Sequence, residues 1–375
     1  MEGRKRKFNQ NWWFSKKTMK KLFILLLLIF SSNLYSEEES ITKVGVLSVF
    51  SGEFSIAGQE VSNAFKTYNR LYLRHPIKFI YEDAKIGSQD GLKAFEKLIN
   101  ISNVDLTIAA SSTNSNLAAK ELINRSKTPN LVVSTAGESI SSAGEYFFRF
   151  GTNDMLNGSQ SAQYLYSLGY RRVVLLVEET EYTNDVTKHF SNEFESLGGK
   201  IIISDSFLPD TSDFKSIVTK IKSRKPDAVF VASQTGLSFA LFLKEWQKQK
   251  GEKIGFHTTF VAAGNIDALK IAGDFVKGTT YLAPSANREF EKYKYFFNEY
   301  LKDHKQKPNF DFIVAGVVDV MDIFQAYLDQ EKVFNTDNFI KFLNTYVQNY
   351  KGLTGNLTLD ERGNTNIGFI PAMIE

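Results

Sequence analysis

The stretch Val44-Gly45-Val46-Leu47-Ser48-Val49 is an apolar run of strand length, and the segment from Glu60 to Leu73 then repeats apolar residues at helical spacing. A second strand is expected from Ile77 to Tyr81. This alternation of short β-branched runs with amphipathic segments continues along the chain. It is typical of parallel sheets that are covered by helices on both faces.

The pattern restarts after residues 148–154. Before this point, further strands are expected at 106–109 and 131–133 and helices at 89–99 and 116–124; after it, helices are expected at 157–168, 185–197, 214–223 and 237–248 and strands at 172–177, 201–203 and 228–231. The restart predicts an α/β fold with two doubly wound parallel-sheet lobes joined by a multi-stranded hinge. We place lobe 1 at residues 41–151 plus 282–350 and lobe 2 at residues 152–281 plus 351–375.

The N-terminal segment has the features of an export signal. Leu22 to Phe30 is an unbroken apolar run that follows Lys20-Lys21, and it is much shorter than the roughly 20 residues that span a bilayer. We therefore expect a cleaved signal peptide at residues 1–36, with Met19 as the better start, and a periplasmic protein. An uncleaved N-terminal anchor is the alternative.

The composition excludes several kinds of site. The chain has no cysteine, which rules out thiol nucleophiles, zinc–thiolate sites and a lipid anchor on an N-terminal cysteine. The net charge of +3 comes from basic residues in the first 21 positions, so no basic face for nucleic acid is implied. The four histidines have no metal-ligand spacing, and we expect them on the surface or in loops.

No catalytic or cofactor motif emerges. There is no Gly-x-Ser-x-Gly elbow, and Gly273 to Thr279 has P-loop glycine spacing without the required lysine, so we interpret it as a turn before a strand. The aromatic helix from Phe290 to Leu301 is expected to pack on lobe 1, and the lysine runs 220–225 and 248–253 to be solvated helix ends. We expect neither a cofactor nor a metal, and no enzyme.

Two polar loops follow neighbouring strands. They are Ser111 to Asn116 and Ser134 to Ser139. Ligands in open α/β sheets bind outside the carboxyl ends of the strands, so these hydroxyl and backbone N–H groups favour an anionic group such as a carboxylate. The alternative is that the side chains only cap helices.

Several short motifs, in their order and spacing, point to a known family. They are Val44 to Gly52, Tyr81 to Ala84, Phe148 to Phe150 with Asp154, Tyr182, Asp213-Phe214, and Gly352 to Gly363. Together they resemble the periplasmic branched-chain amino acid (Leu/Ile/Val) binding proteins of ABC transporters, which have the type I periplasmic-binding fold. The resemblance extends from about Thr42 to Ile374.

This resemblance implies a ligand held between closing lobes. The residues that match the family's lobe-one carboxylate grip are Ser111, Ser112, Thr113, Ser134, Thr135, Ala136 and Glu138. Phe54 and Ser55 match the loop that lines the side-chain pocket. Tyr182, Gln234 and Phe260 are the expected contacts from lobe two.

One departure from the family concerns the acid that pairs with a ligand ammonium. The matching stretch, His257 to Gly264, contains no carboxylate, and a buried ammonium without a partner is costly. Either Glu138 or Glu179 substitutes from another loop, or the ligand has no ammonium.

The resemblance implies a monomeric solute-binding protein that delivers a small carboxylate, such as an amino acid, or a related amide to an inner-membrane ABC permease. The alternative is a sensory module that reports the ligand to a signalling partner. An enzyme on the same frame is a third alternative, which the absence of an acid–base or nucleophile group disfavours.

Overall fold

The computed structural model describes residues 41–375 except 53, 135–136 and 366. Residues 42–375 form one compact unit. The expected signal peptide and Met19 lie outside the described residues. No helix in the described part of the chain is long and apolar enough to cross a membrane.

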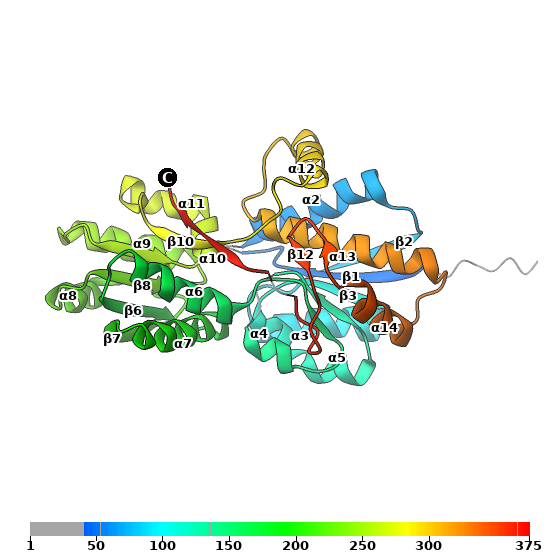
Figure 1. Cartoon of the computed structure of the whole chain (residues 1–375), viewed down its shortest axis with the longest axis horizontal. Helices are drawn as coiled ribbons and strands as arrows, with labels where there is room; N and C mark the ends of the chain where they lie inside the picture. Colours follow the sequence, from blue (N-terminus) through cyan, green and yellow to red (C-terminus); the bar gives the residue numbers. More distant parts are fainter. Residues whose placement is uncertain (1–40, 53, 135–136, 366) are drawn as a thin grey trace, which may run out of the picture. The chain divides into compact units, whose positions relative to one another are not determined.

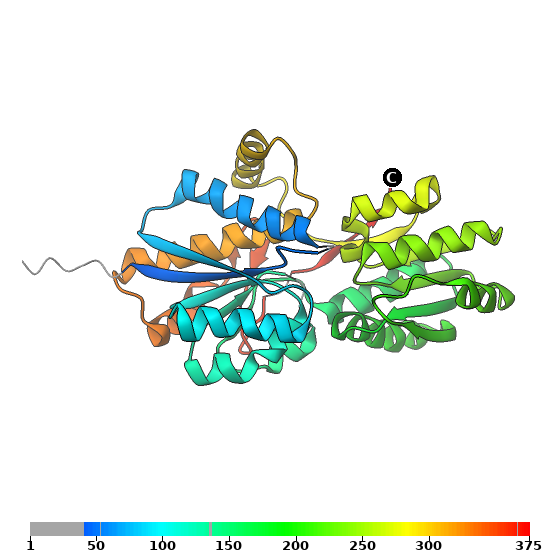
Figure 2. The same ribbon diagram turned by 180° about the vertical axis from the view of Figure 1, so that it is seen from behind.

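The first sheet is fully parallel and has the strand order β2-β1-β3-β4-β5. Its strands are β1 (Thr42–Ser48), β2 (Ile77–Asp83), β3 (Leu106–Ala110), β4 (Asn130–Val132) and β5 (Phe147–Arg149). The connecting helices are α2 (Ser55–Tyr72), α3 (Ser88–Glu96) with the π-helical η1 (Lys97–Ile101), α4 (Thr113–Ala118), α5 (Lys120–Ser126) and the 3-10 helix η2 (Glu138–Ser142). This is lobe one (Figures 1 and 2).

The second sheet has the order β13-β10-β9-β8-β6-β7. Its strands are β6 (Arg172–Glu178), β7 (Lys200–Phe207), β8 (Ala228–Ala232), β9 (Gly255–Thr258), β10 (Thr280–Pro284) and β13 (Phe369–Met373). Its helices are α6 (Asp154–Ser167), α7 (Glu181–Ser196), α8 (Lys215–Ser223), α9 (Gly236–Lys248), α10 (Phe260–Gly264), α11 (Ile266–Leu269) and η3 (Lys270–Val276). We call this part lobe two.

The α/β fold with two sheet lobes confirms the prediction, with one correction. β13 runs antiparallel to β10, so the second sheet is mixed and not purely parallel. Pro371 lies in this edge strand, where a missing N–H is tolerated because it faces away from the sheet. The turn expected around Gly273 to Thr279 is present, with Gly273 and Gly278 at positive φ.

The chain passes between the sheets after β5, after β10 and before β13. Between the last two passages it forms α12 (Glu291–His304), α13 (Asp311–Gln330), α14 (Thr336–Tyr346) and the short hairpin β11 (Tyr350–Lys351) and β12 (Asn356–Leu357). The hairpin loop is held by Asp319 of α13, which accepts hydrogen bonds from Leu353 N (2.6 Å) and Thr354 N (2.9 Å). The exact lobe boundaries stay a prediction, and within residues 351–375 only β13 pairs with the second sheet.

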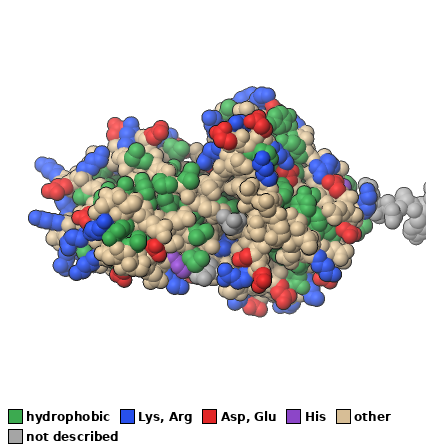
Figure 3. Space-filling model, in the orientation of Figure 1, with side chains coloured by type: hydrophobic (Ala, Val, Ile, Leu, Met, Phe, Trp, Pro, Cys, Tyr) green, Lys and Arg blue, Asp and Glu red, His purple; other side chains and the backbone are tan. Residues whose placement is uncertain are grey.

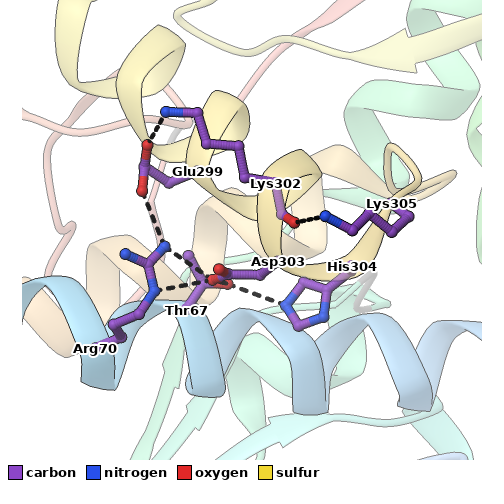
Figure 4. A network of polar contacts seen from close by, with 7 residues as sticks. All are labelled: Thr67, Arg70, Glu299, Lys302, Asp303, His304 and Lys305. Carbon is purple, nitrogen blue, oxygen red and sulfur yellow. Dashed lines mark hydrogen bonds and ion pairs between the residues drawn. The ribbon is translucent and has the colours of Figure 1, made fainter.

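A polar network fastens α12 to α2 (Figure 4). Arg70 of α2 forms ion pairs with Glu299 (3.0 Å) and Asp303 (2.9 Å) of α12. Thr67 donates to Asp303 (2.8 Å). Tyr293, Phe296 and Tyr300 are buried on the inner face of α12. The aromatic helix therefore packs on lobe one, as predicted.

Charged side chains are spread over the face in Figure 3, and Lys and Arg gather over α8 and α9. Lys220, Arg224, Lys225, Lys248, Lys250 and Lys253 are exposed. α8 ends at Ser223 and α9 ends at Lys248. Both lysine runs are therefore solvated helix ends, where cations complement the negative end of the helix dipole.

Candidate functional site

The loops after β3 and β4 are joined at the carboxyl edge of the first sheet. Ser134 Oγ donates to the Ser111 carbonyl at 2.7 Å. Ser112 caps α4: its Oγ accepts from Ser115 N at 3.1 Å and donates to the Ile86 carbonyl at 2.8 Å. The capping interpretation is therefore correct for Ser112. These hydroxyls hold the loops in place, and their role in ligand binding stays a prediction.

The same edge of lobe one meets lobe two at Gly137. Thr113 Oγ1 accepts from Gly137 N at 3.1 Å. A Cβ added at Gly137 would lie 2.5 Å from Asp185 Oδ2 of α7, so a larger residue at this position would displace the Asp185 side chain. Thr135 and Ala136 lie outside the described residues, and so does the side chain of Glu138.

A cavity of about 60 Å³ lies between the lobes. It is lined by Val49, Phe54, Ala57, Ile86, Ala110, Ser111, Ser112, Ser134, Gln234, Val261, Phe310, Phe312 and Ile313. Typical small-molecule sites have roughly 300–1,000 Å³. Phe54, Phe310 and Phe312 are among the lining residues. A ligand larger than this cavity therefore requires lining side chains to move or the lobes to separate.

The structure brings five of the predicted site residues to this cavity. They are Phe54, Ser111, Ser112, Ser134 and Gln234. Ser55 begins α2 directly after Phe54, and Thr113 is buried under Gly137. Neither lines the cavity, and neither do Tyr182 and Phe260.

Tyr182 and Phe260 form the layer behind the cavity on the lobe-two side. Tyr182 is 1% exposed, and its hydroxyl lies 3.4 Å from Asn157 Nδ2. Burial raises the pKa of this hydroxyl well above its usual value. Phe260 is 4% exposed and packs edge-on against Tyr182 and against Phe312 of lobe one, with ring centroids 6.4 and 5.1 Å apart. Phe260 therefore bridges the lobes, and Tyr182 supports it.

No carboxylate or cation lines the cavity among the described residues. Glu179, an expected substitute acid, is exposed and accepts from Ser206 Oγ at 2.6 Å, beside β7. It therefore does not reach the cavity. Glu138 stays untested because its side chain is not described.

Sequence reasoning missed Glu178, the last residue of β6. It is fully buried, and its Oε2 accepts from Ser233 Oγ, from Gln234 N (2.9 Å) and from Thr235 N (3.2 Å). Burial raises the pKa of this carboxyl group. Glu178 thus fixes the loop that presents Gln234 to the cavity. The sequence signal for this residue was a single glutamate directly after the apolar run Val173 to Val177, at the end of a buried strand.

Sequence reasoning also missed the wall formed by Phe310, Phe312 and Ile313 at the start of α13. These residues follow β1 by more than 250 positions along the chain, and periodicity does not reveal which distant segment returns to the cleft. Pro308, just before them, was the nearest available signal for a helix start.

The histidine prediction was wrong for His257. This residue lies on β9 and is fully buried, with Nδ1 2.9 Å from Thr280 Oγ1 and Nε2 3.1 Å from Ser161 Oγ. Burial lowers its pKa to about 3. Two hydroxyl partners explain how a strand of the core accommodates an imidazole. Within the described residues, no cluster of His, Asp and Glu could hold a metal ion.

Larger depressions also lie away from the cleft, and two of them are of the size of typical ligand sites. One, of about 630 Å³, lies between η2 and α14; the other, of about 690 Å³, lies beside β13. Neither contains a predicted site residue. We favour the smaller cavity as the site because it lies at the carboxyl ends of both sheets, where ligands of α/β proteins bind.

The comparisons with known proteins agree with this architecture. The model of the family described as periplasmic binding protein matches residues 42–369. The chain belongs to this family. A Leu/Ile/Val-binding protein homolog of Brucella melitensis is 22% identical over 211 residues, which are 55% of this chain and 54% of that protein. The chain thus spans about half the length of the curated relatives it matches.

Solved structures show the same fold for this family member. The leucine-binding protein LivK of Thermotoga maritima has a TM-score of 0.79 at 18% identity, covering 89% of this chain and 99% of that one. A solute-binding protein of Rhodopseudomonas palustris in complex with 3,4-dihydroxybenzoic acid has a TM-score of 0.76 at 22% identity, covering 90% and 94%. LivJ of Streptococcus pneumoniae in complex with isoleucine has a TM-score of 0.77 at 16% identity, covering 89% of this chain and 100% of that one.

Proposed function

We propose that this protein is an exported solute-binding protein of an ABC transporter and that it closes its two lobes over a small carboxylate that carries no ammonium group. The observation that supports this most is the cavity lining, which has hydroxyls on the lobe-one side, Gln234 on the lobe-two side and no acidic residue among those that the structure describes. Family membership supports the solute-binding role.

The rest of the lining selects for an apolar body. Phe54, Phe310, Phe312 and Val261 offer ring and aliphatic surface, which favours a branched or aromatic group by about 25 cal/mol per Å² buried. An ammonium in this place would lose its hydration without gaining an anionic partner. Relatives of this fold have been solved with isoleucine and with an aromatic acid. Because no carboxylate is found among the described lining residues, the second kind is the better match.

The sharpest test uses two ligands that differ only in the ammonium group. These are 4-methylpentanoate and leucine, with 4-hydroxybenzoate as the aromatic arm. We expect the ammonium-free acids to raise the melting temperature at concentrations where leucine does not, because a ligand at 100 times its Kd stabilises by about 2.7 kcal/mol. Tighter binding of leucine would contradict the ammonium-free assignment, and no shift with any carboxylate would contradict the carboxylate assignment.

Delivery to a permease is part of the same proposal. Co-purification of the liganded protein with a membrane permease would support it. Association with a signalling protein and not with a permease would favour the sensory alternative.

A further inference from the structure

Gln234 carries a buried amide in the wall of the cavity between the lobes. The residue is 9% exposed and lines the cavity. Within the part of the chain that the structure describes, its side-chain amide makes no hydrogen bond to the protein, although an amide offers two N–H donors and a carbonyl acceptor. Buried polar groups are nearly always hydrogen-bonded. The position of this amide therefore indicates a partner that the protein itself does not supply.

The backbone on both sides of Gln234 is held in place. Glu178 Oε2 accepts from Gln234 N at 2.9 Å and from Thr235 N at 3.2 Å. The Thr235 side chain in turn caps α9 by accepting from Ser238 N. The loop therefore presents the amide at a fixed place in the lobe-two wall, and a ligand meets it there without reordering the backbone.

The lobe-one wall offers a different set of groups. Ser112 Oγ donates to the Ile86 carbonyl and Ser134 Oγ donates to the Ser111 carbonyl, so both hydroxyl protons are used within lobe one. Ser111 Oγ accepts from Asn116 Nδ2 at 3.1 Å, and its own proton has no acceptor among the described residues. Ser111 is therefore a lining hydroxyl that can donate to a ligand carboxylate.

We propose that Gln234 is a specificity-determining residue: it recognises an uncharged hydroxyl or carbonyl group at the end of the ligand remote from the carboxylate. The proposal rests on the proposed function and narrows it from small carboxylates in general to hydroxy- and oxo-carboxylates. The carboxylate faces Ser111 of lobe one, and the second polar group faces Gln234 of lobe two. The lining also includes Phe310 and Phe312, which suit an apolar segment between the two polar ends.

Closure of the lobes over a ligand makes this recognition selective. In an open cleft, water pairs with the amide of Gln234. When the lobes close, this water is displaced, and the ligand must supply the hydrogen bond or leave the amide unpaired. A hydroxyl pairs with either end of the amide because it both donates and accepts, whereas a ketone pairs with the N–H end. A hydrocarbon tail offers neither group and should bind more weakly.

The experiment compares acids that differ in the remote group. The probes are 4-hydroxybenzoate with benzoate and 4-oxopentanoate with pentanoate, and isothermal titration calorimetry gives the Kd of each. We expect the wild-type protein to bind the hydroxy or oxo acid at least about tenfold more tightly than its hydrocarbon partner in one pair or both, because a site built to hydrogen-bond a polar group rejects the analogue that lacks it.

Gln234→Met keeps the length of the side chain and removes its amide. We expect this variant to lose the preference, because the polar acids bind more weakly while benzoate and pentanoate bind at least as tightly as before. Ser111→Ala is the matched control, since it removes a polar group of the same cavity from the opposite wall. It should weaken both members of each pair by a similar factor and leave their ratio unchanged.

Equal affinities within both pairs in the wild-type protein would overturn the assignment of Gln234, as would a preference that survives in Gln234→Met. A loss of the ratio in Ser111→Ala as large as the loss in Gln234→Met would overturn it too. Gln234→Leu takes the place of Gln234→Met if that variant does not fold.

The neutral pair 4-hydroxybenzamide and benzamide separates this proposal from the proposed function. If none of the four acids binds but the hydroxylated amide is preferred and Gln234→Met abolishes the preference, the carboxylate assignment is wrong and the role of Gln234 stands. If the acids bind without any preference, the carboxylate assignment stands and the role of Gln234 is wrong. Binding of neither acids nor amides would overturn both.

Discussion

The two lobes differ in how much aromatic packing adds to the hydrogen bonds that hold their cleft residues. On the lobe-one side, carboxylate and hydroxyl groups fix the loops: Glu60 holds the Phe310 backbone, Ser112 caps α4, and Ser134 donates to the Ser111 carbonyl. On the lobe-two side, Glu178 fixes the Gln234 loop through the Gln234 and Thr235 amides in a similar way, but the wall beside that loop is held by aromatic packing, because Phe260 lies between Tyr182 and Phe312. Hydrogen bonds fix the orientation of the loop backbone, and packed rings fill the space between neighbouring elements.

This difference predicts how substitutions on each side of the cleft affect stability. A hydrogen-bonded loop loses its position when one donor or acceptor is removed or changes its protonation state, at a net cost of about 1 kcal/mol per bond. A packed aromatic cluster is insensitive to single polar changes, but truncating a ring costs about 3–5 kcal/mol. Lobe two should therefore carry the larger single-residue effects on stability, and lobe one the more local ones.

Phe260→Ala is expected to have the largest effect. Phe260 is 4% exposed and contacts the rings of Tyr182, Phe312 and Phe369, so its truncation leaves a cavity and should lower the free energy of unfolding by about 3–5 kcal/mol. Urea unfolding measures this loss. Phe275→Ala, at a half-buried ring of the same lobe, is the control and should cost clearly less. A loss below 1 kcal/mol for Phe260→Ala would remove the contrast between the lobes.

The second prediction concerns how the stability of the lobe-two core depends on pH through His257. Its pKa is lowered from 6.5 to about 3 by burial, so below pH 6.5 the unfolded chain binds a proton that the folded protein does not. Stability from this group is present above about 6.5 and is lost as the pH falls toward 3, by roughly 3 kcal/mol between pH 6.5 and 4. Unfolding of wild type and His257→Gln at pH 7 and pH 4 measures the difference. Equal pH slopes for the two proteins would show that His257 binds protons equally in the folded and unfolded states, so that burial does not lower its pKa.

The fold was predictable because burial in a doubly wound sheet is a local pattern. Each buried run such as Val44 to Val49 and each amphipathic segment carries its own periodicity, and their order fixes the sheets. β13 was missed because Phe369 to Met373 is an edge strand in which only Phe369 and Ala372 are even partly buried. α13 was missed because it is buried on nearly all sides, which leaves no amphipathic face.

The residues that line the candidate cavity were predictable only where they follow strand ends. Ser111, Ser112 and Ser134 come directly after β3 and β4, and parallel strands bring their carboxyl ends to one edge. The sequence correctly predicts that Tyr182 follows the carboxyl end of a lobe-two strand. Its side chain, however, points into the core and is fully buried, and residue spacing does not reveal this direction. Phe310 and Phe312 reach the cleft because a segment far along the sequence packs beside it. This placement depends on tertiary packing alone.

The smallest effect on stability is expected from substituting two helix-capping residues at the cleft. These two substitutions also give the most direct comparison of the lobes. Ser112 caps α4 in lobe one and Thr259 caps α10 in lobe two, accepting from Ser115 N and Ala262 N, both at 3.1 Å. Each substitution to alanine should lower the free energy of unfolding by about 1 kcal/mol.

The two caps should nevertheless differ locally. Each substitution also removes a second bond of the same hydroxyl, to the Ile86 carbonyl for Ser112 and to the Ser233 carbonyl for Thr259. The amides of the loop at Ser112 should then exchange faster than those of the rest of lobe one. The loop at Thr259 is also held by the ring contacts of Phe260, so its amides should change little. Hydrogen exchange of both alanine variants, with Ser112→Thr as the conservative rescue, decides the matter. Equal loosening of the two loops would mean that aromatic packing does not stabilise the lobe-two wall independently of its hydrogen bonds.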